Sequence, residues 1–266
     1  KMKIMGIINA TPDSFSDGGD NENLSVVLEK VGLWLGFGVD ILDIGGESTR
    51  PGSEPVPTEI EIKRTIPLIQ AIKERFPHLY ISIDTTKYEV AEQAIANGAD
   101  MINDISGLTF EPRLAELASK HNKALCIMHL PAPPKIMQQS IHYDNLLDDI
   151  YTFLSRQIAF ARSQGVEQIY ADVGIGLSFG KTFEQNWELL RNIDYFRRLG
   201  VPLLLGISRK RFIGEFLQIP EPKERDFATM LIHALLWQKQ IEIIRVHNVE
   251  MAVMMRKVAE KLNEYP

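Results

Sequence analysis

The chain has 266 residues, of which 45% are hydrophobic and 24% charged, a balance typical of a globular protein with a sizeable core. Its formal net charge of −6 at pH 7 argues against nucleic acid and anionic membrane surfaces as partners. The single cysteine, Cys126, excludes a disulfide framework and a cysteine-based zinc site, and its apolar neighbours predict an inert buried thiol. No apolar run approaches the roughly 18 residues of a membrane span. The first residues lead directly into an apolar strand, without the features of a signal peptide, so we expect a cytoplasmic protein.

Short apolar runs rich in β-branched residues alternate with helix-like segments along the chain. Predicted strands cover residues 4–8, 40–44, 80–83, 101–105, 124–128, 169–171, 202–207 and 241–246. Helical spacing of apolar residues, as in Leu154, Ile158 and Ala161, marks residues 59–75, 90–97, 143–163, 183–199 and 227–240. Gly98 follows one of these predicted helices as a C-cap.

Eight strands, each followed by a helix, at a spacing of about 30 residues, predict a (β/α)8 TIM barrel, an α/β fold. A doubly wound open sheet would have fewer strands and a glycine-rich turn after the first one. The first turn here reads Asn9-Ala10-Thr11-Pro12-Asp13, which is not such a turn. No linker rich in Pro, Gly or Ser divides the chain, so we expect a single domain over residues 1–266.

Each predicted strand ends in a polar or charged residue, and the catalytic groups of this fold come from those ends. Asp84 and Asp172 are carboxylates that need partners once they are buried. A ring with an exocyclic amine and a ring N–H would supply such partners, while Asn103 offers a donor and an acceptor and Lys210 offers three donors. These four residues indicate a flat, polar heterocycle as the ligand. A structural ion pair between Asp172 and Lys210 and a Schiff-base role for Lys210 remain as alternatives.

Cationic residues gather at the ends of the last two predicted strands. Arg245 and His247 alternate along the eighth strand and so point to the same side, and Ser208 and Arg209 end the seventh. These neighbouring ends commonly form the phosphate site of a barrel, and arginine carries a planar fork of donors suited to phosphate oxygens. We therefore expect an anion site here, with pairing of Arg245 to a barrel carboxylate as the alternative.

Two loops, residues 11–20 and 45–53, combine glycines with polar side chains and could not be buried elements. They are predicted to be mobile covers over the barrel mouth. Ordinary solvated turns are the alternative. The short motif Gly174-Ile175-Gly176 is too common to carry weight by itself.

The chain resembles the dihydropteroate synthase family from about residue 5 to residue 250. Any single motif could arise by chance, but seven motifs in the family's order are specific. They are Met5-Gly6-Ile7-Ile8-Asn9-Ala10-Thr11-Pro12-Asp13-Ser14-Phe15-Ser16-Asp17-Gly18-Gly19, Glu47-Ser48-Thr49-Arg50-Pro51-Gly52, Ser82-Ile83-Asp84-Thr85, Ile102-Asn103-Asp104-Ile105, Met128-His129, Ser208-Arg209-Lys210-Arg211-Phe212-Ile213-Gly214 and Arg245-Val246-His247.

The resemblance implies a transferase of folate biosynthesis that joins 6-hydroxymethyl-7,8-dihydropterin diphosphate to p-aminobenzoate. It also implies a sulfonamide target and a homodimer formed through the side of the last, very apolar helices. By family pattern, Asn9 would help to hold Mg²⁺, and Asp84, Asp172 and Lys210 would be catalytic. The implied binding residues are Asp84, Asn103, Asp172 and Lys210 for the pterin, Asn9, Arg245 and His247 for the diphosphate, and Thr49, Arg50, Pro51 and Arg211 for p-aminobenzoate.

The implied chemistry needs no side-chain nucleophile. Mg²⁺ and the cations would neutralise the charge that develops on the departing diphosphate. The departure would leave a pterin methylene cation, which Asp84 is placed to stabilise, and the aromatic amine would attack that carbon. Closure of the two loops would keep water away from the cation.

Several positions depart from the family pattern. Val173 stands where proline is usual, Leu177-Ser178 look like two extra residues, and Asn248 replaces an aspartate. Arg211 stands where many members have serine, and it could alter the p-aminobenzoate contacts and the response to sulfonamides. Two other functions remain as alternatives, a pterin-binding methyltransferase acting with a corrinoid protein and a non-catalytic pterin-binding barrel.

Overall fold

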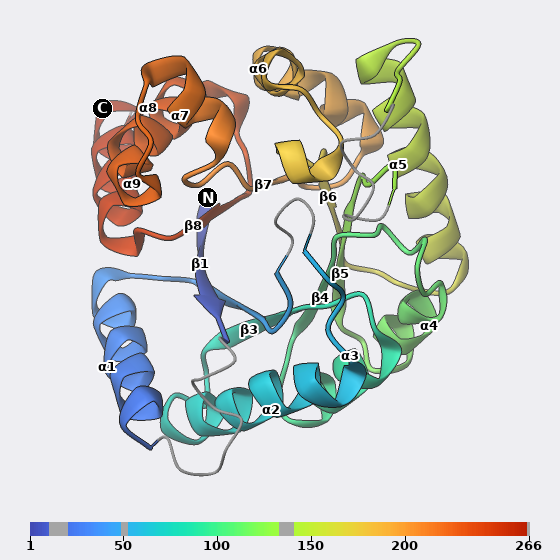
Figure 1. The fold of residues 1–266 in the computed structure, drawn as a ribbon, viewed down its shortest axis with the longest axis vertical. Helices are drawn as coiled ribbons and strands as arrows, with labels where there is room; N and C mark the ends of the chain where they lie inside the picture. Colours follow the sequence, from blue (N-terminus) through green and yellow to red (C-terminus); the bar gives the residue numbers. More distant parts are fainter. Residues whose placement is uncertain (11–20, 49–52, 133–140, 265–266) are drawn as a thin grey trace.

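A computed structural model describes residues 1–10, 21–48, 53–132 and 141–264. Within these residues, eight parallel strands form one sheet in the order β6-β5-β4-β3-β2-β1-β8-β7. A parallel bridge between Ala171 in β6 and Leu203 beside β7 joins the two edges of this sheet. The sheet thus closes into a barrel, and Figure 1 shows the helices lying around it as an outer layer. The predicted (β/α)8 barrel is confirmed.

Most of the strands lie within one or two residues of the predicted runs. The seventh is shorter than expected because Pro202 has no N–H and the N–H of Leu203 donates to the side chain of Glu242 (2.6 Å). The strands are β1 (Lys3–Asn9), β2 (Ile41–Gly45), β3 (Tyr80–Asp84), β4 (Met101–Asp104), β5 (Ala124–Met128), β6 (Ile169–Asp172), β7 (Leu204–Leu205) and β8 (Ile243–Val246).

The predicted helices are present, although two of them are divided. Residues 183–199 form an α-helix and a 3-10 helix that meet at Asn192, and residues 227–240 form a similar pair. The C-cap of the third helix is Asn97 rather than the predicted Gly98, which follows it with a φ of 111°, a value that favours glycine. The described α-helices are α1 (Asn21–Phe37), α2 (Thr58–Arg75), α3 (Tyr88–Ala96), α4 (Arg113–Lys120), α5 (Leu146–Ser163), α6 (Phe183–Arg191), α7 (Arg211–Leu217), α8 (Asp226–Leu235) and α9 (Val249–Leu262), and the 3-10 helices are η2 (Leu177–Phe179), η3 (Ile193–Leu199), η4 (Pro222–Arg225) and η5 (Trp237–Lys239). In this part of the chain, no helix has both the length and the apolar character needed to cross a bilayer.

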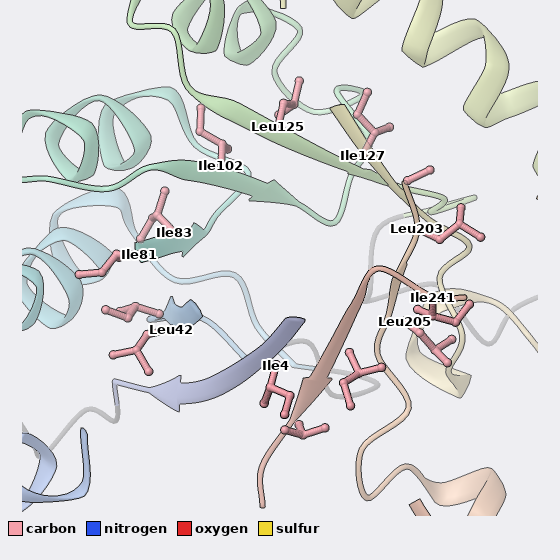
Figure 2. Close-up of a cluster of buried hydrophobic side chains, with 14 of the residues drawn as sticks. Ile4, Leu42, Ile81, Ile83, Ile102, Leu125, Ile127, Leu203, Leu205 and Ile241 are labelled. Carbon is pink, nitrogen blue, oxygen red and sulfur yellow. The ribbon is translucent and has the colours of Figure 1, made fainter. Parts of the chain in front are cut away.

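Side chains alternate between the two faces of each strand, and the two faces build two separate clusters. The outer faces pack beneath the helices as one large cluster, part of which Figure 2 shows around Ile4, Leu42, Ile83 and Leu125. A smaller apolar cluster fills the inside of the barrel, and it contains Met5, Ile41, Met101, Ala124, Cys126, Leu204 and Ile243. Cys126 is fully buried there, and burial raises the pKa of its thiol well above the ordinary value, as expected for an inert cysteine.

The register places polar side chains above this interior cluster. Met5 lies opposite Ile41 in the lower layer, and Ile7 lies opposite Asp43 one inward-facing position higher. Asp84, the last residue of β3, lies one such position higher again, opposite Gly45. The apolar cluster therefore closes the amino-terminal end of the barrel, and the polar groups face its other end.

The first testable feature is the close packing of β1 against α1. A Cβ on Gly6 would lie 2.5 Å from a ring carbon of Trp34 and 3.0 Å from Val249, whereas a Cβ on Gly36 in α1 would meet nothing within 4 Å. We expect Gly6→Ala to lower the free energy of unfolding by about 1–3 kcal/mol because the bulky ring must shift. The control Gly36→Ala should leave stability unchanged or raise it by up to about 1 kcal/mol. Urea unfolding measures both, and equal stabilities for Gly6→Ala and the parent would contradict the packing described here.

Candidate active site

Side chains from four strands meet inside the barrel near its carboxyl-terminal end. Arg245 on β8 places Nε 2.7 Å from Oδ2 of Asp43 and Nη2 3.6 Å from Oδ2 of Asp84. Asn103 on β4 donates from Nδ2 to the same Asp43 oxygen at 3.1 Å. Two carboxylates, a guanidinium and a carboxamide thus form one polar cluster. The pairing of Arg245 with a barrel carboxylate, predicted as the alternative to anion binding, is present.

The electrostatics of this cluster depend on burial. Burial and the neighbouring Asp43 raise the pKa of Asp84 well above the ordinary value, and Arg245 opposes this shift. Burial lowers the pKa of Arg245, but Asp43 and Asp84 more than offset it, so the guanidinium stays charged. Oδ1 of Asp43 is buried and has no hydrogen-bond partner within the described residues. Such an acceptor costs free energy until a donor from water or a ligand reaches it.

Asp43 was not predicted as a site residue. It lies in the middle of β2 rather than at its end, and only 1% of its surface is exposed. The sequence did contain a signal, because a lone acidic residue interrupts an apolar strand at Ile41-Leu42-Asp43-Ile44. A buried charge of this kind requires a partner, and that partner is Arg245.

Asp172 and Lys210 occupy the other side of the mouth, and the charge of Arg245 lowers the pKa of both. Asp172 ends β6 and accepts a hydrogen bond from the N–H of Gly174 (2.8 Å). Burial raises the pKa of Asp172, whereas the Gly174 N–H and Lys210 lower it. Asp84, Asn103, Asp172, Lys210 and Arg245 therefore lie around one mouth.

Lys210 does not form the structural ion pair that was the alternative for it. Its Nζ donates to the carbonyl oxygen of Ile175 and lies 4.7 Å from the ring centre of Phe179. Burial lowers the pKa of Lys210 to about 8, although Asp172 acts in the opposite direction. The ammonium is thus held beside the carboxylate of Asp172 and remains able to reach a ligand.

The turn after β7 sets the directions of the Ser208 and Arg209 side chains. Arg209 has a φ of 62°, an unfavourable value for a residue other than glycine. Its guanidinium is bound by Asp226 at 2.7 and 3.0 Å, and its carbonyl accepts from Arg225 at 2.8 Å. Arg209 was predicted to offer two parallel N–H donors to a phosphate. In this structure those donors, Nε and Nη2, already bind the carboxylate of Asp226. The turn instead brings Ser208 to His247.

His247 is neutral in this structure. Burial, together with Arg209 and Arg245, lowers the pKa of His247 to about 3. The hydroxyl oxygen of Ser208 accepts from the backbone N–H of His247 (3.1 Å) and lies 2.7 Å from its Nδ1. Because this oxygen already accepts the N–H, its own hydrogen is free for Nδ1, which leaves the imidazole proton on Nε2.

A groove of about 390 Å³ adjoins His247, at the side of the barrel between α1 and α9. Two lysines that sequence reasoning missed, Lys30 and Lys223, line it together with Arg209. Burial and the repulsion of Arg209 and Lys223 lower the pKa of Lys30. These lysines come from helices remote in sequence, so no local pattern could have grouped them.

Of the remaining predicted residues, the structure describes Asn9 and Arg211. Asn9 ends β1 with an exposed side chain, and Arg211 begins α7, also exposed, with its guanidinium 5.8 Å from the ring centre of Phe183. Thr49, Arg50 and Pro51, like the whole predicted loop 11–20, lie outside the described residues. No cluster of three or more His, Cys, Asp or Glu side chains able to hold a metal occurs in the ranges that the structure describes.

Both sides of the segment 49–52 are anchored to the barrel. Glu47 accepts from Lys87 at 3.0 Å and from the N–H of Val56 at 2.7 Å. Lys87 also binds the buried Glu61 of α2 at 2.7 Å, and Thr85 donates to the same carboxylate. Residues 47 and 56 are therefore fixed to α2 and to the loop after β3, while residues 49–52 of the predicted cover lie outside the described residues.

A buried lysine that sequence reasoning missed lies beneath the turn after β6. Only 1% of the surface of Lys181 is exposed, and its Nζ lies 2.7 Å from Nδ1 of His129 and 3.2 Å from the carbonyl oxygen of His129. Lys181 stands in a loop between η2 and α6. The search for polar residues at strand ends therefore did not find it.

Comparison with known proteins shows which family this chain belongs to. The family described as "Pterin binding enzyme" matches residues 5–247. The dihydropteroate synthase of Synechocystis is 46% identical over 261 residues, which is 97% of this chain and 89% of that protein. The dihydropteroate synthase of Xanthomonas albilineans with 4-aminobenzoic acid superposes with a TM-score of 0.89 at 36% identity, covering 100% of this chain and 94% of that one. The same enzyme in complex with 7,8-dihydropteroate gives a TM-score of 0.86 at 35% identity, with 100% and 95% coverage.

The chain therefore belongs to the family of pterin-binding enzymes. Within that family it groups with the dihydropteroate synthases, and its activity is that of this folate-pathway transferase. The relatives and structures described above do not favour a corrinoid-dependent methyltransferase or a non-catalytic barrel.

The protonation state of His247 can be tested directly. Because burial and two arginines keep the imidazole neutral, we expect its ¹⁵N signals to stay constant between pH 5 and 8, with the proton on Nε2, where an ordinary histidine titrates. Ser208→Ala, which removes the hydroxyl that fixes the tautomer, is the matched comparison and should show a mixture of tautomers. A His247 titration near pH 6.5 in the parent protein would contradict this assignment.

Proposed function

We propose that the chain condenses 6-hydroxymethyl-7,8-dihydropterin diphosphate with p-aminobenzoate to give 7,8-dihydropteroate and diphosphate, with the residues around the barrel mouth in the roles set out below. The observation that carries this assignment is the convergence of Asp84, Asn103, Asp172, Lys210 and Arg245 on one mouth. Carboxylates and a carboxamide match the amine and ring N–H groups of a pterin, and cations beside them match a diphosphate.

The pterin is held between the two sides of the mouth. Asp172 accepts hydrogen bonds from its amine edge, Asn103 supplies a donor and an acceptor, and Lys210 donates to a ring carbonyl or nitrogen. Lys210 already donates to the carbonyl of Ile175, so it reaches the ligand by exchanging one hydrogen bond for another. Asp84, whose ionised form Arg245 favours, would stabilise the positive charge that develops on the methylene group as the diphosphate departs.

The diphosphate binds at the ends of β1 and β8. Arg245 keeps one side of its fork on Asp43, and 23% of its side chain is exposed. The Nε2 hydrogen of a neutral His247 donates to a phosphate oxygen, and Asn9 adds a neutral donor at the end of β1. Lys30 and Lys223 in the adjoining groove add positive potential where the diphosphate leaves.

Mg²⁺ fits the residues present at this site. It binds through oxygen ligands, keeps several waters, and commonly takes one or two protein oxygens together with substrate phosphates. The carboxamide oxygen of Asn9 would be such a ligand, and Asn9 ends β1, the strand that pairs with β8. When bound, Mg²⁺ neutralises charge on the departing diphosphate.

The p-aminobenzoate binds farther from the barrel floor, with Thr49, Arg50, Pro51 and Arg211 as its binding residues. Residues 47 and 56, on either side of the first three, are linked by the hydrogen bond from the N–H of Val56 to Glu47, which also accepts from Lys87. Arg211 offers a guanidinium to the p-aminobenzoate carboxylate, and the same contact would bear on sulfonamides.

Diphosphate release from the purified chain tests the proposed activity. With pterin diphosphate, p-aminobenzoate and Mg²⁺ together we expect steady release, and removal of Mg²⁺ with a chelator should suppress it. Lys210→Ala and Asp172→Asn should each weaken pterin binding by about tenfold or more, because a buried polar group loses its partner. The control Lys120→Ala, an exposed lysine at the end of α4, should behave like the parent. Parent-like calorimetric affinity in either active-site variant would overturn the pterin assignment.

Removal of Arg245 separates the pterin and diphosphate subsites. Arg245→Ala should weaken binding of the pterin diphosphate by about 100-fold, since charge-assisted hydrogen bonds to phosphate are lost. Binding of free 6-hydroxymethylpterin should fall far less. Calorimetry with the two ligands gives the comparison, and equal losses for both would remove Arg245 from the diphosphate site.

We also propose that the protein is a cytoplasmic homodimer. Apolar side chains recur every four residues on α8 and again on α9, and the two helices pack against each other. This face carries Phe227, Leu231 and Leu235 of α8 and Met254, Val258 and Leu262 of α9, all exposed, and Leu235 and Leu262 are at least 80% exposed. Two exposed stripes of this kind on adjacent helices are typical of a protein–protein interface.

Charge placed on this face tests the dimer. Leu235→Glu should convert the dimer to a monomer in sedimentation velocity, because burying an unpaired carboxylate opposes association. Leu33→Glu on α1, an exposed apolar residue elsewhere on the barrel, is the matched control and should stay dimeric. A monomeric parent at micromolar concentration would refute the proposed dimer.

A further inference from the structure

Lys181 is a fully buried cation whose function is unaccounted for. It stands between η2 and α6, and the helix that follows begins at the capping box of Thr182 and Gln185. Its neighbours are the ring and carbonyl of His129 at the end of β5, and the carboxylate of Asp172 acts on its charge. A lysine removed from water in this way is maintained only where its ammonium has partners.

The contacts of Lys181 suit an ammonium rather than a neutral amine. Burial lowers the pKa of Lys181 well below its ordinary value, Asp172 offsets only part of this shift, and Lys210 adds to it, so the ammonium depends on the acceptors around Nζ. His129 is itself neutral, since burial and Lys181 lower its pKa to about 2, and its ring packs edge-on against Phe153 with centres 5.0 Å apart. A neutral imidazole with its proton on Nε2 presents Nδ1 as an acceptor, so Nζ has two acceptors beside a carboxylate.

The turn that carries Asp172 rests directly on this lysine. A Cβ on Gly174 would lie 2.7 Å from Nζ of Lys181 and would collide with the carbonyl oxygen of His129. Gly174 has a φ of 75° and donates its N–H to Oδ1 of Asp172. The backbone N–H of His129 in turn donates to the carbonyl of Asp172 (2.9 Å). Lys181, His129 and the turn from Asp172 to Gly174 therefore form one contact unit beneath the mouth.

We propose that Lys181 is a positioning residue for the pterin-binding carboxylate: its ammonium, bound to His129 beneath the Gly174 turn, holds Asp172 in place and in its ionised form. The inference rests on the proposed role of Asp172. The proposal gives different roles to the two lysines that act on this carboxylate. Lys210 at the mouth exchanges its protein partner for the ligand, whereas the fully buried Lys181 acts on Asp172 from its place against the Gly174 turn.

Loss of Lys181 has a consequence that a merely structural residue would not produce. Asp172 accepts the pterin N–H groups as a carboxylate, so pterin affinity falls as pH drops through its pKa. The groups facing Asp172 are Lys210, Lys181 and Arg245, with His129 and Cys126 on the adjacent strand. Without the ammonium of Lys181, the pKa of Asp172 rises, and the acid limb of pterin binding moves to higher pH.

The experiment measures binding of free 6-hydroxymethylpterin by calorimetry across pH 5 to 8 in the full chain. Lys181→Met keeps the length of the side chain and removes its charge. We expect binding about tenfold weaker at pH 6, with the acid limb shifted upward and the loss smaller at pH 8. Lys73→Met is the matched control, because Lys73 also binds a carbonyl (Leu79, 2.6 Å) and a carboxylate (Asp100, 3.5 Å), but at the opposite end of β3. A pH-independent loss in Lys181→Met would overturn the proposal.

Two further readouts keep the test decisive. In an Asp172→Asn background, Lys181→Met should change the residual pterin affinity by less than about twofold, because the charge it supports is gone. An undiminished effect there would show that Lys181 acts through packing alone. If Lys181→Met does not fold, ¹⁵N spectra of His129 in the parent protein test the proposal instead. An ammonium at Lys181 requires the His129 proton on Nε2, because Nδ1 must accept its hydrogen bond. A proton on Nδ1 would contradict the proposal. Failure of the parent to bind pterin would count against the proposed function and leave the His129 result to stand alone.

Discussion

The burial of charge inside a closed barrel is the constraint on which the site depends. Asp43 is almost fully buried in the middle of β2, and a lone carboxylate there would be strongly unfavourable. Arg245 from β8 satisfies it at 2.7 Å, and the same guanidinium reaches toward Asp84. The arginine is thereby fixed in direction before any ligand arrives, and an oriented cation at the barrel mouth needs little reorganisation to meet a departing anion.

The same principle organises the opposite side of the mouth. Asp172 lies between Lys210 and Lys181, one at the opening and one beneath it. Around the outer rim, the carboxylate of Asp226 binds the guanidinium of Arg209 and so stabilises the strained turn. The ammonium of Lys87 binds the carboxylates of Glu47 and Glu61. Several charged groups around the mouth are thus each held by an opposite charge, which keeps them in one orientation.

The sequence predicted the barrel because strand and helix periodicities alternate eight times, and the strand-end rule then found Asp84, Asn103, Asp172 and Lys210. It missed Asp43, which lies one inward-facing position below the strand end, and Lys181, which reaches the site from a loop. It misjudged Arg209, because the carboxylate that occupies its guanidinium comes from α8, 17 residues later. Local pattern identifies the groups at a mouth, but their pairing is a property of the packed chain.

The apolar cluster that fills the amino-terminal half of the barrel also determines from which side molecules can enter the site. Met5, Met101, Cys126 and Ile243 stop that end, so molecules arrive and leave through one opening. The proposed pterin position is the deeper one, and whatever occupies the outer position blocks the way to it. In the proposed arrangement, the bicyclic ring would enter before the aromatic amine, and the finished conjugate would leave through the same opening before the next cycle begins.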